Sequence, residues 1–196
     1  MLHELHLCRA PCAGLQTPDE YAPAVAALHE LVRGRDDAAL TAIAEEVQML
    51  ATGQRFEDAA RRRDRLAGLI LALERAQRLA ALAAVPELVG ARPDGHGGWE
   101  LAVLRHGRLV AAGVARRGVP PMPVVEALRL GAQTIIPGAG PLRGAPAEEV
   151  GLVHRWLTTD GTRLVYADPP WTEPARGAAS WRPWAERARP VSLEVD

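Results

Sequence analysis

The stretch "RFEDAARRRDRLAGL", residues 55–69, begins with the only phenylalanine of the chain, Phe56. The alanine, arginine and leucine residues that follow it favour a helix. A core residue normally lies deeper within a helix, whereas Phe56 stands at the helix start, beside a loop and ahead of charged side chains. We therefore expect Phe56 to contact another protein. The alternative is that it packs as a staple on the preceding helix or on the following, strand-containing half.

The helix that begins near Phe56 continues through "LAGLILALERAQRLAAL" to about Leu82. The preceding stretch, "DDAALTAIAEEVQMLATG", predicts a helix that starts at Asp36 or Asp37 and ends at Gly53. Its apolar stripe consists of Leu40, Ile43, Val47 and Leu50. Because a short loop joins antiparallel neighbours, we expect residues 36–84 to form a helical hairpin.

An earlier helix is predicted from "TPDEYAPAVAALHELVRG". Thr17 as N-cap and Glu20 three residues later form a capping box, and Pro18 stands at the first helical position. Gly34 marks the end of this helix. With the cysteine-containing residues before it, the helix makes a first segment, 1–35.

The sequence texture changes after Pro86. "GGWELAVLRHGRLVAAGVARRG" predicts a β-hairpin that turns at Arg105-His106-Gly107. A helix from Pro123, the loop "PGAGPLRGAP", the helix "AEEVGLVHRWL" and the strand "TRLVYAD" follow. We expect a small α+β domain over 85–172 and an irregular or partly disordered tail over 173–196. The predicted fold class is α+β, with the helical module first.

Composition limits the function only weakly. The chain has 196 residues, a formal charge of -1 and no lysine, so nothing global indicates a nucleic acid or an anionic membrane as partner. No apolar run approaches the ~20 residues of a membrane span. Two cysteines without an export signal indicate a reducing compartment, and we expect a cytoplasmic protein.

Three stretches in series, "CRAPCAG", "DEYAPAV" and "MLATGQRFEDAARRRDRLAGL", resemble UvrC, the nuclease subunit of bacterial nucleotide excision repair. The resemblance is greatest to the actinobacterial variety that is fused to a DEDD-type exonuclease. The family's UVR motif is a helical hairpin whose second helix starts Phe-Glu, continues Ala-Ala and ends Arg-Asp. The matching positions here are Phe56, Glu57, Ala59, Ala60, Arg63 and Asp64. Residues 85–115 are similar to the β-rich stretch that follows the motif.

The resemblance implies that this hairpin pairs with the UVR hairpin of a UvrB-type partner. Phe56 would be the apolar anchor and Ala59 and Ala60 would allow close helix approach, while Glu57, Arg63 and Asp64 would set the register by charge pairs. Gln54 and Arg62 depart from the family, which more often has apolar residues there.

The family's GIY-YIG nuclease domain, the fused exonuclease and the Asp-x-Ser strand of its RNase H-like site have no counterpart in this sequence. We therefore expect a DNA-repair accessory without a catalytic residue. We expect indirect contact with DNA through its partner, and the sequence leaves open whether the α+β half binds DNA.

Cys8 and Cys12 follow His3 and His6 closely enough to suggest four zinc ligands, but Pro11 between the cysteines makes tetrahedral closure awkward. The resemblance implies that the two cysteines belong to a four-cysteine iron–sulfur set, whose other members would have to come from elsewhere. We expect no cofactor. A metal-binding regulatory fragment that uses Cys8 and Cys12 remains an alternative.

A second alternative comes from "LVYADPPW", residues 164–171. Asp-Pro-Pro-Trp after an apolar strand resembles the catalytic loop of amino-group nucleic-acid methyltransferases, with Asp168 accepting from the target amine and Trp171 stacking on the flipped base. No clear cofactor-binding glycine loop and helix accompanies it, and too few strands are predicted for a doubly wound sheet. The other interpretation is a rigid proline turn that ends an edge strand.

Overall fold

The computed structural model describes residues 9–188, which divide into two compact units. The described residues up to Glu74 and from Ala175 onward form a helical unit, and Arg75–Pro174 form a unit with a sheet. The helix α3, Phe56–Ala84, begins in the first unit and ends in the second. The boundary between the two units therefore lies within α3, between Glu74 and Arg75, and not in the loop that follows this helix.

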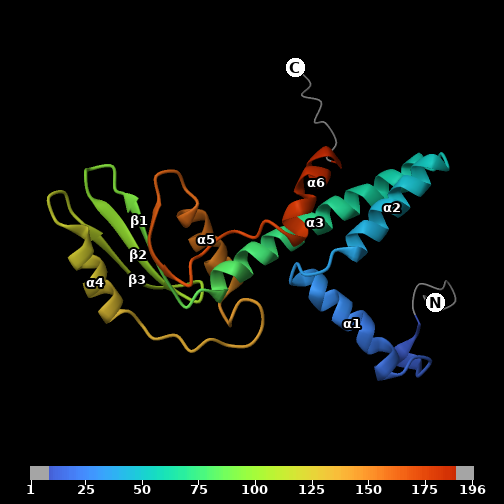
Figure 1. Cartoon of the computed structure of the whole chain (residues 1–196), viewed down its shortest axis with the longest axis horizontal. Helices are drawn as coiled ribbons and strands as arrows, with labels where there is room; N and C mark the ends of the chain where they lie inside the picture. Colours follow the sequence, from blue (N-terminus) through green and yellow to red (C-terminus); the bar gives the residue numbers. More distant parts are fainter. Residues whose placement is uncertain (1–8, 189–196) are drawn as a thin grey trace, which may run out of the picture. The chain divides into compact units, whose positions relative to one another are not determined.

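The helical unit contains a short 3-10 helix, Pro11–Ala13, and the helices α1, Pro18–Val32, and α2, Ala38–Thr52. The predicted capping box is present: the Thr17 hydroxyl accepts from the Glu20 amide, and the Glu20 carboxylate accepts from the Thr17 amide at 2.8 Å. Helix α2 and the first part of α3 run side by side as a helical hairpin (Figure 1). The buried core of this unit is built from Leu31, Leu40, Leu66, Ala67, Ile70, Leu73, Ala178, Ala185 and Ala188.

The segment after residue 174 differs from its prediction. An irregular tail was expected, but the described part forms a 3-10 helix, Gly177–Trp181, and the helix α6, Arg182–Ala188. Small alanines let α6 pack closely into the core of the helical unit. The Trp181 indole Nε1 donates to Asp37 Oδ2 over 2.8 Å, at the start of α2. Pro183 does not interrupt α6, because proline is tolerated in the first turn of a helix.

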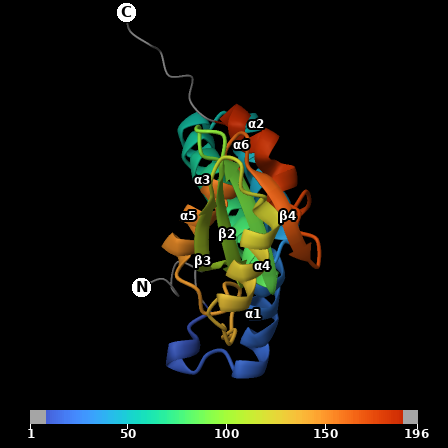
Figure 2. The ribbon, with the colours of Figure 1, turned by 90° about the vertical axis from the view of Figure 1, so that its left-hand side faces the viewer.

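The sheet-containing unit has four strands: β1, Glu87–Pro93; β2, Trp99–Arg105; β3, Arg108–Ala115; and β4, Arg163–Asp168. Their order is β3-β2-β1-β4, and each neighbouring pair is antiparallel; Figure 2 shows β3 and β4 toward opposite sides of the sheet. The predicted β-hairpin is β2–β3, with His106 and Gly107 at positive φ in a two-residue turn. The strand β1 was not predicted.

Helices cover both faces of this sheet (Figure 1). Helix α4, Pro121–Gly131, packs on one face, where Val125 and Leu128 contact the side of β2 that carries Leu101 and Val103. The other face packs on helix α5, Ala147–Leu157, and on the last turns of α3. The core residues on this side include Leu79, Leu82, Leu88, Leu104, Val150 and Leu157. The fold class is therefore mixed helix and antiparallel sheet, as the sequence predicts.

Candidate partner-binding site

The closed end of the hairpin is a three-residue turn between α2 and α3. The amide of Arg55 donates to the carbonyl of Leu50 over 2.9 Å, and the amide of Gln54 donates to the carbonyl of Ala51 over 3.0 Å. This hydrogen-bond pair is a Schellman motif, which needs a left-handed residue after the helix. Gln54 takes that position with φ 56°, whereas the adjacent Gly53 has φ -78°. The expected glycine stop is thus displaced by one residue.

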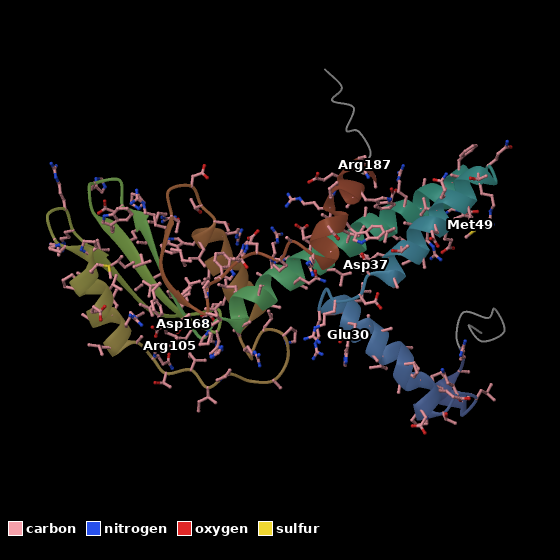
Figure 3. All side chains as sticks on the ribbon, in the orientation of Figure 1. Glu30, Asp37, Met49, Arg105, Asp168 and Arg187 are labelled. Atoms are coloured by element: carbon pink, nitrogen blue, oxygen red, sulfur yellow. The ribbon has the colours of Figure 1, made fainter. Side chains whose placement is uncertain are left out.

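Phe56 begins α3 at this end, and 67% of its surface is exposed. Met49, in the last turns of α2, is exposed to the same extent and lies near the closed end of the hairpin (Figure 3). Farther along the hairpin, Leu40, Leu66 and Ile70 are almost completely buried. The tip therefore presents apolar side chains to solvent, while these three side chains farther along lie in the core of the helical unit. Phe56 is not enclosed as a staple would be.

The other residues singled out by the UVR resemblance differ in exposure. Glu57 is almost fully exposed and Asp64 is exposed, whereas Arg63 is half-buried and donates to Asp64 over 2.8 and 2.9 Å. Ala60 is half-buried, and Ala59 is buried. The small side chain of Ala59 therefore packs inside the protein. The other five side chains, including that of Phe56, lie at or near the surface.

Two ion-pair systems near the tip were not predicted. The Arg62 guanidinium holds Glu46 of α2, with Nε 2.9 Å from Oε2. Asp58 lies between Arg55 and Arg61, and the hydrogen bonds from these two guanidiniums lower the pKa of its carboxyl group. The exposure of Met49 was not predicted either. The sequence does contain a signal for it, because Met49 is an apolar residue that lies outside the apolar stripe of α2.

The Asp-Pro-Pro-Trp segment follows β4, an edge strand of the antiparallel sheet. Asp168 is exposed at the end of β4, opposite Glu87 in the ladder. Trp171 is half-buried against the core, with its ring edge-on to His154 at 6.0 Å between centroids. The strands that adjoin the segment are antiparallel, whereas a nucleotide-type doubly wound sheet is parallel. The local arrangement fits the proline turn after an edge strand.

Cys12 is exposed, and Cys8 lies outside the described residues, as do His3 and His6. Within residues 9–188, no cluster of three or more His, Cys, Asp or Glu side chains is placed to hold a metal ion. In the same part of the chain, no helix combines the length and the apolar character that a membrane crossing requires.

The chain is similar to bacterial proteins along much of its length. It is 49% identical over 195 residues to the "Putative bifunctional exonuclease/endonuclease protein" of Mycobacterium tuberculosis, a match that covers 97% of this chain and 30% of that protein. It is 27% identical over 113 residues to the UvrABC system protein C of Geobacter metallireducens, covering 57% of this chain and 18% of the other. With the Deinococcus radiodurans protein of the same name it shares 41% over 59 residues, 30% of this chain and 10% of the other.

This chain therefore spans about a third or less of the length of these relatives. No family model matches it, and no solved structure matches it. The predicted resemblance to UvrC-type proteins is confirmed at the level of a UvrC-like region. The UVR motif and its partner stay predictions.

Proposed function

We propose that this chain is the part of a UvrC-like DNA-repair protein that docks a UvrB-type partner, without a nuclease site of its own. The α2–α3 hairpin is the docking element, and its tip is the contact surface. The observation that carries the proposal is the exposure of Phe56 and Met49, both at 67%, near the closed end of a hairpin in which Leu40, Leu66 and Ile70 are buried. Similarity to proteins named UvrABC system protein C supports the repair context.

The physical basis is that a two-helix hairpin buries only one side of each helix and leaves its tip for a second hairpin. Phe56 is followed by Glu57, which is nearly fully exposed and has only a long contact of 3.8 Å to Arg61, so that its carboxylate could form a charge pair with the partner. Met49 extends the apolar surface onto α2, and its flexible thioether adapts to an irregular partner surface. Aromatic anchors of this kind contribute a disproportionate share of binding energy.

The direct test is the affinity of the full chain for a purified UvrB-type protein, measured by calorimetry. Burial of a phenylalanine is worth about 1.5–3 kcal/mol, and each ~1.4 kcal/mol is tenfold, so Phe56→Ala should weaken binding about 10- to 100-fold. The matched control is Leu28→Ala in α1, which removes a similarly exposed apolar side chain (56%) away from the tip. The control should bind like the unaltered chain.

The melting temperature separates docking from a structural role. Phe56→Ala should leave the melting temperature within about a degree or two of the original value, because the ring is mostly exposed and contributes little to the buried core. Equal affinities for Phe56→Ala and Leu28→Ala would refute the docking role of the tip. A large fall in melting temperature would instead assign Phe56 to the core.

A further inference from the structure

The sheet-containing unit has a hollow of about 510 Å³ between the last turns of α3 and helix α5. Arg75 and Arg78 line it from α3, and Arg155 lines it from α5. The apolar lining comes from Leu79 and Leu152. Three guanidinium groups thus border one concave site, which neither the proposed docking of the hairpin tip nor the packing of the sheet uses.

Within the described part of the chain, these three arginines have no carboxylate partner. Among residues 9–188, no hydrogen bond or ion pair involves the guanidinium of Arg75, Arg78 or Arg155. Elsewhere in the same unit, Arg92 and Arg105 lie 2.6 and 2.8 Å from glutamate oxygens. The Nε of Arg78 is also buried without a hydrogen-bond partner in the described part of the chain. An acceptor from outside the chain, a water molecule or a ligand oxygen, would satisfy this donor.

The charges around the hollow favour a multiply charged anion. Glu148 is the carboxylate among the lining residues, and His154 lies there with its Nε2 already 2.6 Å from Glu173 Oε1. Three guanidiniums against one carboxylate leave an excess of about two positive charges. One carboxylate ligand would neutralise half of that excess, whereas a phosphate dianion or two adjacent phosphodiesters would match it. Arginine forks also fit phosphate oxygens two at a time.

Gly151 of α5 lines this site beside Arg75. A Cβ atom added at this glycine would lie 3.5 Å from Nη2 of Arg75. Alanine would therefore fit at ordinary contact distance. A longer acidic side chain would reach the guanidiniums and occupy the space of a ligand.

We propose that the hollow between α3 and α5 binds phosphate groups, with Arg75, Arg78 and Arg155 as the donors. The phosphate belongs either to a nucleic-acid strand or to a free phosphate ion. Both sources offer the same oxygens to the arginines, and competition between them tells them apart. The hollow and the hairpin tip belong to different units and share no residue, so the hollow does not depend on the docking of a UvrB-type partner.

The first test measures binding of a fluorescein-labelled single-stranded oligonucleotide to the full chain by anisotropy, at several salt concentrations. Inorganic phosphate is titrated in parallel by calorimetry. Arg78→Gln should weaken binding at least about fivefold and lower the salt dependence by about one ion, as expected for one lost phosphate contact. The control Arg116→Gln removes the same charge from an exposed arginine that does not line the hollow. It should leave the affinity within twofold.

The second test uses Gly151. Gly151→Glu places a tethered carboxylate among the arginines and should abolish binding of the oligonucleotide and of phosphate. Gly151→Ala should bind like the unaltered chain and shows that the helix tolerates a side chain there. Both variants are expected to fold, because alanine and glutamate favour a helix more than glycine does.

The outcomes divide cleanly. Oligonucleotide binding that inorganic phosphate displaces supports a strand phosphate as ligand, and binding of inorganic phosphate alone supports a small-molecule phosphate. Equal loss of affinity in Arg78→Gln and Arg116→Gln would overturn the site in favour of diffuse charge. So would tighter binding of a polyglutamate peptide than of either phosphate probe, or no binding of either probe at low salt.

Discussion

Arg62 of α3 reaches across the hairpin to Glu46 of α2, placing Nε 2.9 Å from one carboxylate oxygen and Nη2 against the same oxygen. Arg62 stands where apolar residues are more usual in the family that the sequence resembles. The two helices are thus joined at this position by a charge pair. Both side chains are about 40% exposed, which limits the strength of the pair.

A double-mutant cycle measures this pair. Arg62→Ala and Glu46→Ala, alone and together, should give a coupling free energy of up to about 1 kcal/mol in urea unfolding, because exposed ion pairs are screened by water. In high salt the coupling should shrink. A coupling of zero in low salt would mean that the helices are held by their apolar seam alone.

The two helix ends of the helical unit allow a comparison of left-handed residues. Helix α1 ends in the same hydrogen-bond pattern as α2, but with Gly34 at φ 70° in the position that Gln54 occupies. Non-glycine residues are strained there by about 1–2 kcal/mol. We expect Gln54→Gly to raise the free energy of unfolding by about 0.5–1 kcal/mol after the entropy of the unfolded chain is counted.

The reverse exchange is the control for this comparison. Gly34→Ala should lower the free energy of unfolding by about 1 kcal/mol or more, because alanine cannot adopt the same angle without strain. Chemical denaturation of both variants under one condition checks the pair. Effects of the same sign at Gly34 and Gln54 would contradict this account of the turn.

Gly90 on β1 faces helix α5 at very close range. A Cβ atom there would lie 2.7 Å from the Trp156 ring and 2.9 Å from Leu157 Cδ2, and both groups are held in the core. Gly90→Ala should therefore cost about 1–3 kcal/mol of stability through overpacking. Gly68→Ala, in the exposed middle of α3 with no atom within 4 Å of the added Cβ, should instead stabilise by about 0.5–1 kcal/mol. Thermal unfolding of the two variants gives opposite shifts if the packing is as described.

The Glu87 carboxylate predicts a pH dependence of stability. Burial raises the pKa of Glu87, but the hydrogen bonds and charges of Arg105 and Arg129 together lower it by more, so that the pKa lies below its usual 4.5. A lowered pKa in the folded state stabilises the protein above the unfolded value, and this stabilisation is lost as the pH falls through the folded value. Glu87→Gln should therefore cost about 2 kcal/mol at pH 7 and flatten the fall of stability below about pH 5. Glu100→Gln, whose Arg92 partner is more exposed, should change both quantities less.

The sequence pattern predicted most of the helices and the β2–β3 hairpin because their signals are local. Thr17, Glu20 and Gly34 define α1 by capping chemistry, and the His106-Gly107 turn defines the hairpin. The exposure of Phe56 was expected from its place at a helix start. These features depend on a few neighbouring residues, so the sequence alone contains them.

The strand β1 was missed because its signal is not local. Its central residues are buried on both faces, so apolar and polar residues do not alternate, and Gly90 and Pro93 suggest a loop. Position 90 requires a glycine because the Trp156 ring of α5 lies against it and leaves no room for a side chain. The arginine hollow was missed for the same reason, because Arg78 and Arg155 are brought together by the packing of two helices far apart in the sequence.

The hydrogen bond between Trp181 and Asp37 bears on the order in which the two units fold during synthesis. The two residues are 144 positions apart, and Arg182 joins Glu74 across 108 positions. On the ribosome, the helical core lacks its last helix until residues 175–188 emerge, whereas Arg75–Pro174 has all of its strands before then. Nascent chains usually fold from the amino terminus. Here the middle of the polypeptide is free to fold first, and the unit that holds the amino-terminal helices completes its core last.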